Sequence, residues 1–138
     1  MNLSPYLNFR GTCKEAFTLY AAALNGKITM MMTFGESPMS DQVPPDQQHL
    51  VVHASLDLGQ GHLILGSDAP PERYQAPQGM MVSYSVATVD EAKRVFDALA
   101  DGAQIVMPIG PTFWSAQFGM LTDRFGIPWM INCEQMPA

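Results

Sequence analysis

The sequence contains little charge and no cluster of basic residues. Only 14% of its 138 residues are charged, seven are Lys or Arg, and the net charge is −6. Because nucleic-acid-binding surfaces need clustered positive charge, we expect no nucleic-acid partner. No apolar run approaches the ~20 residues of a membrane-spanning helix, so we expect no membrane partner either.

The sequence is also poor in cysteine. Cys13 and Cys133 lie at opposite ends of the chain and form no CxxC pair. This spacing indicates reduced thiols and not a disulfide framework. The first residues, "MNLSPYLNFRG", have neither the basic nor the apolar region of a signal peptide. We therefore expect a cytoplasmic protein.

Two segments share one helix pattern. The segments are "TCKEAFTLYAAALNG" at 12–26 and "TVDEAKRVFDALADG" at 88–102. Glu15 corresponds to Glu91, so the two segments match at a constant offset of 91 − 15 = 76 residues. Thr12 with Glu15, and Thr88 with Glu91, have the spacing of a capping box, in which the threonine hydroxyl accepts from a backbone N–H of the first turn. Gly26 and Gly102 are the last residues of the two segments and predict left-handed helix ends. Each segment carries one apolar stripe, so both helices are expected to bury one face.

Strand-like segments flank each predicted helix in the same order. The two halves therefore read as β-α-β-β-β, at 1–66 and 80–134, joined by a Pro-rich linker at 67–79. Gly61 and Gly126 occupy equivalent turns before the last strand of each half. We expect one α+β domain over residues 1–138, built from tandem βαβββ units.

Three motifs resemble a known family. "NFRGTCKEAFTLY", "HASLDLGQGHLILGSD" and "TFWSAQFGMLTDRFGIPWMIN" are similar to the PhnB-like branch of the vicinal oxygen chelate superfamily. This superfamily includes glyoxalase I, bleomycin resistance proteins and extradiol dioxygenases, and the branch often carries the label 3-demethylubiquinone 3-methyltransferase. The resemblance implies two sheets curled into a cup of mixed strands, and a homodimer.

Metal-using relatives place one ligand on the first and one on the last strand of each unit. Counting along the motifs puts these positions at Pro5, Leu65, Met81 and Met130. None of the four offers the oxygen, imidazole or thiolate that zinc or a hard divalent ion prefers. We therefore predict no metal ligands, no cofactor and no glyoxalase-type metal lyase activity. The sequence also lacks a glycine-rich nucleotide-binding turn and room for a Rossmann-type domain, so we expect no methyltransferase activity.

Strand alternation predicts which side chains line the cup. The lining is expected to be mainly apolar, which suits a small apolar or aromatic ligand. The expected ligand-binding residues are Leu7, Ser55, Leu63, Leu65, Met81, Ser83, Trp114, Phe118, Met130 and Asn132. Trp114 lies in a Gly/Pro-rich loop, where it would either cover the cup or fill the edge of the core.

The leading hypothesis is a metal-independent protein that binds a small molecule. A second hypothesis is an enzyme of lyase or isomerase type. There His53 would be the catalytic residue, a general base toward a carbonyl substrate, with or without a metal held at other positions. His53 would otherwise be a hydrogen-bonded structural residue. A third hypothesis is an interaction dimer whose own side chains fill the cup.

Overall fold

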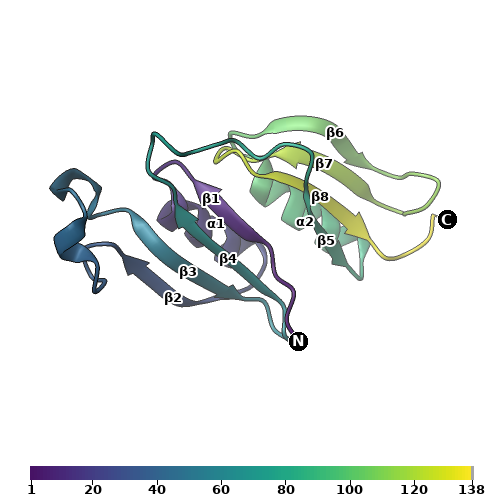
Figure 1. Ribbon diagram of the computed structural model, residues 1–138. Helices are drawn as coiled ribbons and strands as arrows, with labels where there is room; N and C mark the ends of the chain where they lie inside the picture. Colours follow the sequence, from purple (N-terminus) through teal and green to yellow (C-terminus); the bar gives the residue numbers. More distant parts are fainter. Residues whose placement is uncertain (138) are drawn as a thin grey trace. The chain divides into compact units, whose positions relative to one another are not determined.

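The computed structural model describes residues 1–137 and divides into two compact units, Met1–Gln75 and Ala76–Ala138. The first unit begins with β1 (Tyr6–Phe9), α1 (Cys13–Ala23) and β2 (Lys27–Thr33) (Figure 1). Two 3₁₀ turns follow, η1 (Ser40–Gln42) and η2 (Pro45–Gln47). The unit ends with β3 (Val51–Asp57) and β4 (Leu63–Asp68). The second unit contains β5 (Val82–Val86), α2 (Val89–Ala100), β6 (Gln104–Gly110), β7 (Phe118–Thr122) and β8 (Pro128–Cys133). The predicted βαβββ order is confirmed in both units. The first unit extends beyond residue 66, however, because β4 ends at Asp68.

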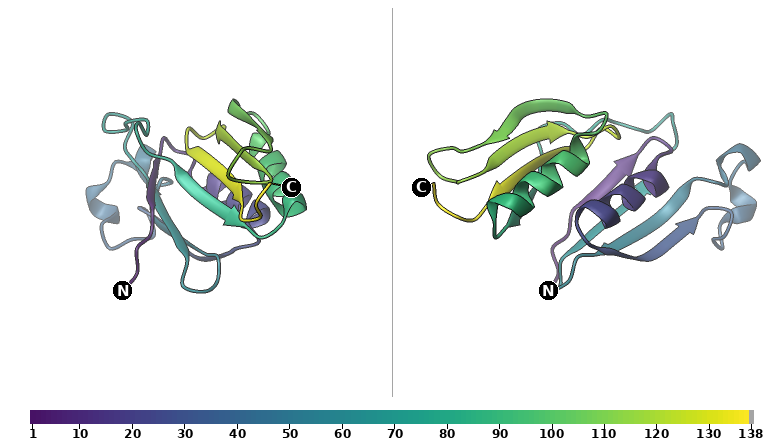
Figure 2. Two further views of the ribbon diagram at one scale, coloured as in Figure 1. Left: turned by 90° about the vertical axis from the view of Figure 1, so that its right-hand side faces the viewer. Right: turned by 180° about the vertical axis from the view of Figure 1, so that it is seen from behind.

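Each unit is a four-stranded mixed sheet with its helix on one face (Figure 2). The strand orders are β1-β4-β3-β2 and β5-β8-β7-β6. In each sheet the first strand pairs in parallel with the last, and the other ladders are antiparallel. The α+β prediction is therefore confirmed, whereas the cup and the homodimer stay predictions. No helix in residues 1–137 is long and apolar enough to cross a membrane.

The predicted helix stripes form the cores. Phe17 and Tyr20 of α1 are fully buried and contact the Phe9 ring of β1 at centroid distances of 6.1 and 6.4 Å. In the second unit, Val95 of α2 and Trp129 of β8 are fully buried. Burial of such large apolar side chains is the main force that holds each helix against its sheet.

The two helices begin differently. Thr88 is extended, and its hydroxyl accepts a 3.2 Å hydrogen bond from the Glu91 backbone N–H, as predicted. The equivalent prediction for Thr12 is wrong, because within the described residues its side chain makes no capping bond. Instead, the buried carboxylate of Asp68 accepts from the backbone N–H groups of Cys13 at 3.0 Å and Val51 at 2.8 Å. A carboxylate from β4 thus caps α1.

The helix ends differ as well. Gly102 has a φ of +73°, as predicted, but the left-handed residue after α1 is Asn25 with a φ of +54°, not Gly26. Asparagine tolerates this conformation better than most residues. Gly26 is required for a different reason, since a Cβ there would lie 2.8 Å from Leu58 Cδ2 and 3.1 Å from the Asp57 carbonyl oxygen. The turn glycines Gly61 and Gly126 both have positive φ, as expected.

The Cys13 thiol stays protonated in the fold. Burial, and then the nearby Asp68 carboxylate, raise its pKa from 9.0 to about 12. An unfolded chain releases this proton near its ordinary pKa, so the thiol should lower the free energy of unfolding progressively as the pH rises from 9.0 towards 12. Urea unfolding of the native protein and of Cys13→Ala across this range should show the steeper alkaline loss in the native protein. Equal slopes would contradict the assignment.

Candidate functional site

The face of each sheet opposite its helix carries the candidate functional residues. We define the first open face by Tyr6, Asn8, Met30, Met32, His53, Ser55, Leu63, Leu65 and Ser67. We define the second open face by Ser83, Ser85, Phe118, Met120, Met130 and Asn132. Burial alternates along the strands in agreement with this division, most clearly in β4 and β8. Each face is described within its own unit.

Most of the predicted ligand-binding residues lie on these two faces. The first open face includes Ser55, Leu63 and Leu65 together with His53. The second includes Ser83, Phe118, Met130 and Asn132. Met81 lies just before β5, and Trp114 lies in the loop between β6 and β7. A role of these residues in ligand binding stays a prediction.

The predicted placement of Leu7 on the face opposite the helix is wrong. Leu7 is only 8% exposed and lies with Phe9 on the helix side of β1, whereas Tyr6 lies opposite Leu65 on the first open face. The cause is the loop between strand and helix, which spans residues 10–12 in the first unit but only 87–88 in the second. Counting back from the helix at a constant offset therefore shifts β1 by one residue, and a one-residue shift exchanges the two faces.

In both units, the residue expected at the first ligand position lies before its strand. Pro5 and Met81 both precede their strands, and the ladders instead place Tyr6 opposite Leu65 and Ser83 opposite Met130. The strand residues that lie opposite Leu65 and Met130 are therefore a tyrosine, one residue after Pro5, and a serine, two residues after Met81. Across residues 1–137, no group of three or more His, Cys, Asp or Glu side chains is arranged to hold a metal ion.

The rings of Tyr6 and His53 contact each other on the first open face. The Tyr6 hydroxyl lies 3.2 Å from Nδ1 of His53, and the rings stack with centroids 5.7 Å apart and planes 29° from parallel. Tyr6 was not among the residues predicted from the sequence. The apolar alternation Leu7–Phe9 was the available signal, because it marks the buried face and leaves Tyr6 on the other.

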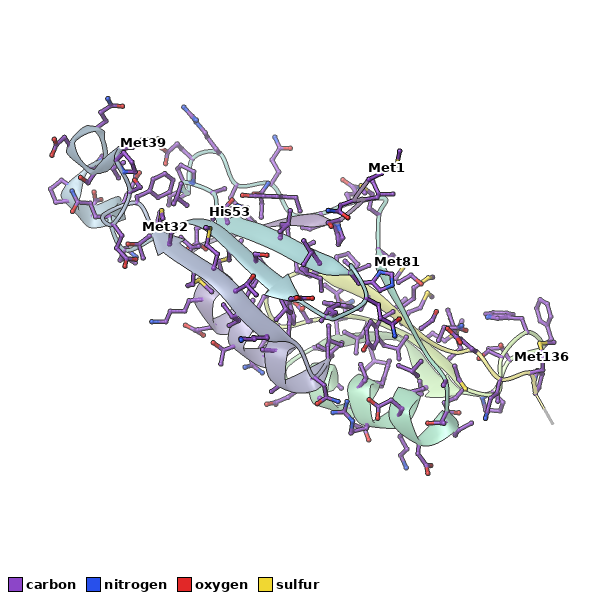
Figure 3. All side chains as sticks on the ribbon, turned by 90° about the horizontal axis from the view of Figure 1, so that it is seen from below. Met1, Met32, Met39, His53, Met81 and Met136 are labelled. Carbon is purple, nitrogen blue, oxygen red and sulfur yellow. The ribbon has the colours of Figure 1, made fainter. Side chains whose placement is uncertain are left out.

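Two methionines lie beside His53 on the neighbouring strand. Met32 of β2 is the cross-strand partner of His53, and Met30 is the partner of Ser55. Figure 3 shows Met32 and His53 side by side on these two strands. Met31 lies opposite the buried Ala54 and so takes the helix side of the sheet. The run of three methionines is thus divided between two faces.

The second open face contains an amide with an unsatisfied acceptor. Nδ2 of Asn132 donates to the Ser85 hydroxyl at 3.5 Å, a long hydrogen bond. Oδ1 of Asn132 is buried and has no hydrogen-bond partner within residues 1–137. Buried polar atoms in proteins are nearly always paired, so this exception calls for an explanation, such as an ordered water or a ligand.

Aromatic side chains lie beside this amide. Phe118 is the cross-strand partner of Asn132, and the Trp114 ring packs edge-on against Phe118 with centroids 5.1 Å apart. Trp114 is 41% exposed, so it does not fill the core. The adjacent Ser115 is fully buried, and its hydroxyl donates to the Cys133 carbonyl at 2.6 Å. The loop is therefore tied to the end of β8, while the indole stays partly exposed and contacts the rings of Phe113 and Phe118.

Comparison with known proteins agrees with this architecture. The model of the "Glyoxalase/Bleomycin resistance protein/Dioxygenase superfamily" matches residues 3–131. Protein YjdN of Escherichia coli (strain K12) is 38% identical over 147 residues, covering 100% of this chain and 99% of that protein. The crystal structure of protein PA1353 from Pseudomonas aeruginosa is 44% identical, covers 98% of both chains and has a TM-score of 0.89.

A further solved structure shows the same fold at lower identity. The PhnB protein from Bacillus cereus, whose name carries the 3-demethylubiquinone-9 3-methyltransferase label, is 24% identical over 96% of this chain and 99% of its own, with a TM-score of 0.80. The repeated βαβββ units, the match over residues 3–131 and the full-length relative together establish the family. The chain belongs to the glyoxalase/bleomycin resistance protein/dioxygenase superfamily.

Proposed function

We propose that the protein binds a small aromatic molecule that carries an N–H or O–H donor, and that the second open face holds it. The observation that carries this proposal is the buried, unsatisfied Oδ1 of Asn132. A ligand donor would satisfy this atom, while its ring would pack against Phe118 and Trp114. Homodimerisation and a cytoplasmic location stay predictions.

The energetics favour a ligand that has both a hydrogen-bond donor and an aromatic ring. An unsatisfied buried acceptor costs about 1–3 kcal/mol, which a ligand donor would recover. Offset or edge-to-face aromatic contacts add about 0.5–1.5 kcal/mol beyond the apolar area that they bury. Met120 and Met130 are partly buried neighbours on the same face, and their flexible side chains adapt to rings of different shape. A purely apolar molecule would leave the Asn132 oxygen without a partner.

The methyltransferase label of the Bacillus cereus protein is not part of this proposal. That protein is similar at 24% identity, which supports a common fold and nothing beyond it. A sheet face with one amide acceptor and two aromatic rings is suited to hold a ligand, and it supplies no group placed for methyl transfer.

The proposal predicts a preference for p-cresol over toluene, two rings that differ only by a hydroxyl. We expect p-cresol to bind at least ~10-fold more tightly, since one satisfied buried acceptor is worth about 1.4 kcal/mol or more. Asn132→Leu should abolish this preference while toluene binding remains. Isothermal titration calorimetry with both compounds measures the ratio.

The matched control for this experiment is Asn8→Leu. Asn8 lies on the first open face, and its Oδ1 already accepts a hydrogen bond from Ser67 at 3.2 Å. This variant should retain the native preference for p-cresol. A preference that survives Asn132→Leu, or the absence of binding by both compounds at millimolar concentration, would contradict the proposal.

A further inference from the structure

The first open face presents one imidazole and two thioethers on adjacent strands. His53 lies on β3, Met32 lies directly opposite on β2, and Met30 lies one position further along the same face. Side chains that are directly opposite have Cβ atoms about 4.5–5.5 Å apart, and diagonal neighbours lie about 7–8 Å apart, within reach of long side chains. Methionine has three rotatable side-chain bonds, so both sulfur atoms can turn towards the imidazole.

The Tyr6 contact determines which imidazole nitrogen is available. Nδ1 of His53 is engaged by the Tyr6 hydroxyl at 3.2 Å, which leaves Nε2 for another partner. A histidine that binds a metal almost always gives its other ring N–H to a hydrogen-bond acceptor, which fixes the tautomer. The phenol oxygen of Tyr6 can accept from Nδ1–H, so the Nε2 lone pair would be free for an ion.

We propose that Nε2 of His53 and the sulfur atoms of Met30 and Met32 bind copper(I). Thioether sulfur is a soft, neutral ligand that suits copper(I) and does not suit the hard ions magnesium and calcium. One imidazole with two thioethers provides three ligands of the type that this ion prefers. The net charge of −6 favours the approach of a cation.

The site is accessible to an ion from solvent. Met30 is 44% exposed and Tyr6 is 48% exposed, whereas His53 and Met32 are partly buried. The copper proposal concerns the first unit and is independent of the aromatic-ligand proposal for the second. Either proposal can therefore fail without affecting the other.

Methyl NMR under anaerobic conditions tests this site residue by residue. The protein is labelled with ¹³C at the methionine ε-methyl groups and titrated with copper(I) in acetonitrile-containing buffer, with silver(I) as a redox-inert parallel. We expect the Met30 and Met32 methyl signals and the His53 ring signals to shift together and saturate at one ion per chain. The Met31 methyl signal should not shift, because Met31 lies on the helix side of the sheet.

The variants provide a matched comparison within one methionine run. Met30→Leu and Met32→Leu each remove a proposed ligand and should weaken copper(I) binding by about 10-fold or more. Tyr6→Phe removes the hydroxyl that orients the imidazole and should weaken binding by about 10-fold. Met31→Leu should leave the affinity unchanged. Equal effects of Met31→Leu and Met32→Leu would overturn the proposal. Uptake by Cys13 or Cys133 without shifts of Met30 and Met32, seen as loss of titratable thiol, would also overturn it.

Discussion

Replacing Asp123 by alanine is expected to lower the free energy of unfolding by about 3 kcal/mol or more, because several buried donors lose their acceptor together. Oδ1 of Asp123 accepts from the backbone N–H groups of Phe125 at 2.9 Å and Ile127 at 3.0 Å. Oδ2 accepts from the indole Nε1–H of Trp129 at 2.9 Å. Asp123 and Trp129 are both buried, so water cannot replace the carboxylate freely.

Tryptophan fluorescence during urea unfolding measures this effect directly. Both tryptophans, Trp114 and Trp129, belong to the second unit, so the signal reports the unit that contains Asp123. Asp101→Ala is the matched control, because it removes the same charge from a side chain that is 87% exposed. The control should change the free energy of unfolding by less than ~0.5 kcal/mol. Similar losses in both variants would show that net charge and not the buried bonds is responsible.

Asp68→Ala is expected to destabilise the first unit by about 2–3 kcal/mol, because two buried backbone N–H groups lose a charged acceptor. These groups belong to Cys13, at the start of α1, and Val51, at the start of β3. One carboxylate thus joins the last strand of the unit to its helix and to a second strand. Its loss should loosen α1 and β3 together.

Hydrogen exchange measured by mass spectrometry locates the effect of Asp68→Ala. Peptides that cover α1 and the start of β3 should exchange faster in this variant, while peptides from the second unit should retain the native rate. Asp41→Ala, at an exposed position of η1 in the same unit, should leave every peptide unchanged. Unchanged exchange in α1 of Asp68→Ala would show that this carboxylate does not hold the helix.

Local sequence patterns predicted the features that depend on neighbouring residues. The stripe of α2, its Thr88 cap and the left-handed Gly102 all follow from spacing within one helix. The Asp68 cap of α1 could not be predicted in this way, because Asp68 and Cys13 are 55 residues apart in the sequence. Tertiary structure supplied a stronger acceptor than the local Thr12.

The candidate site was predicted in part. Strand alternation correctly placed Asn132 and Met130 on one face of β8. It could not reveal that the Asn132 side-chain oxygen lacks a hydrogen-bond partner, because the bonding of this amide depends on residues far away in the sequence, such as Ser85, which is 47 residues distant. Tyr6 was missed because a difference of one residue in loop length exchanged the faces of β1. Errors of this kind arise wherever a repeat is extended across a loop of variable length.

The most direct test of the proposed binding function is a ¹H–¹⁵N spectrum of the protein recorded with increasing p-cresol. We predict shifts of the Asn132 side-chain amide and the Trp114 indole N–H, with little change at the buried Trp129 indole, which donates to Asp123. Toluene should shift Trp114 but leave the Asn132 amide nearly unchanged. Shifts confined to other residues, or identical Asn132 responses to the two compounds, would contradict the proposal that this amide anchors the ligand.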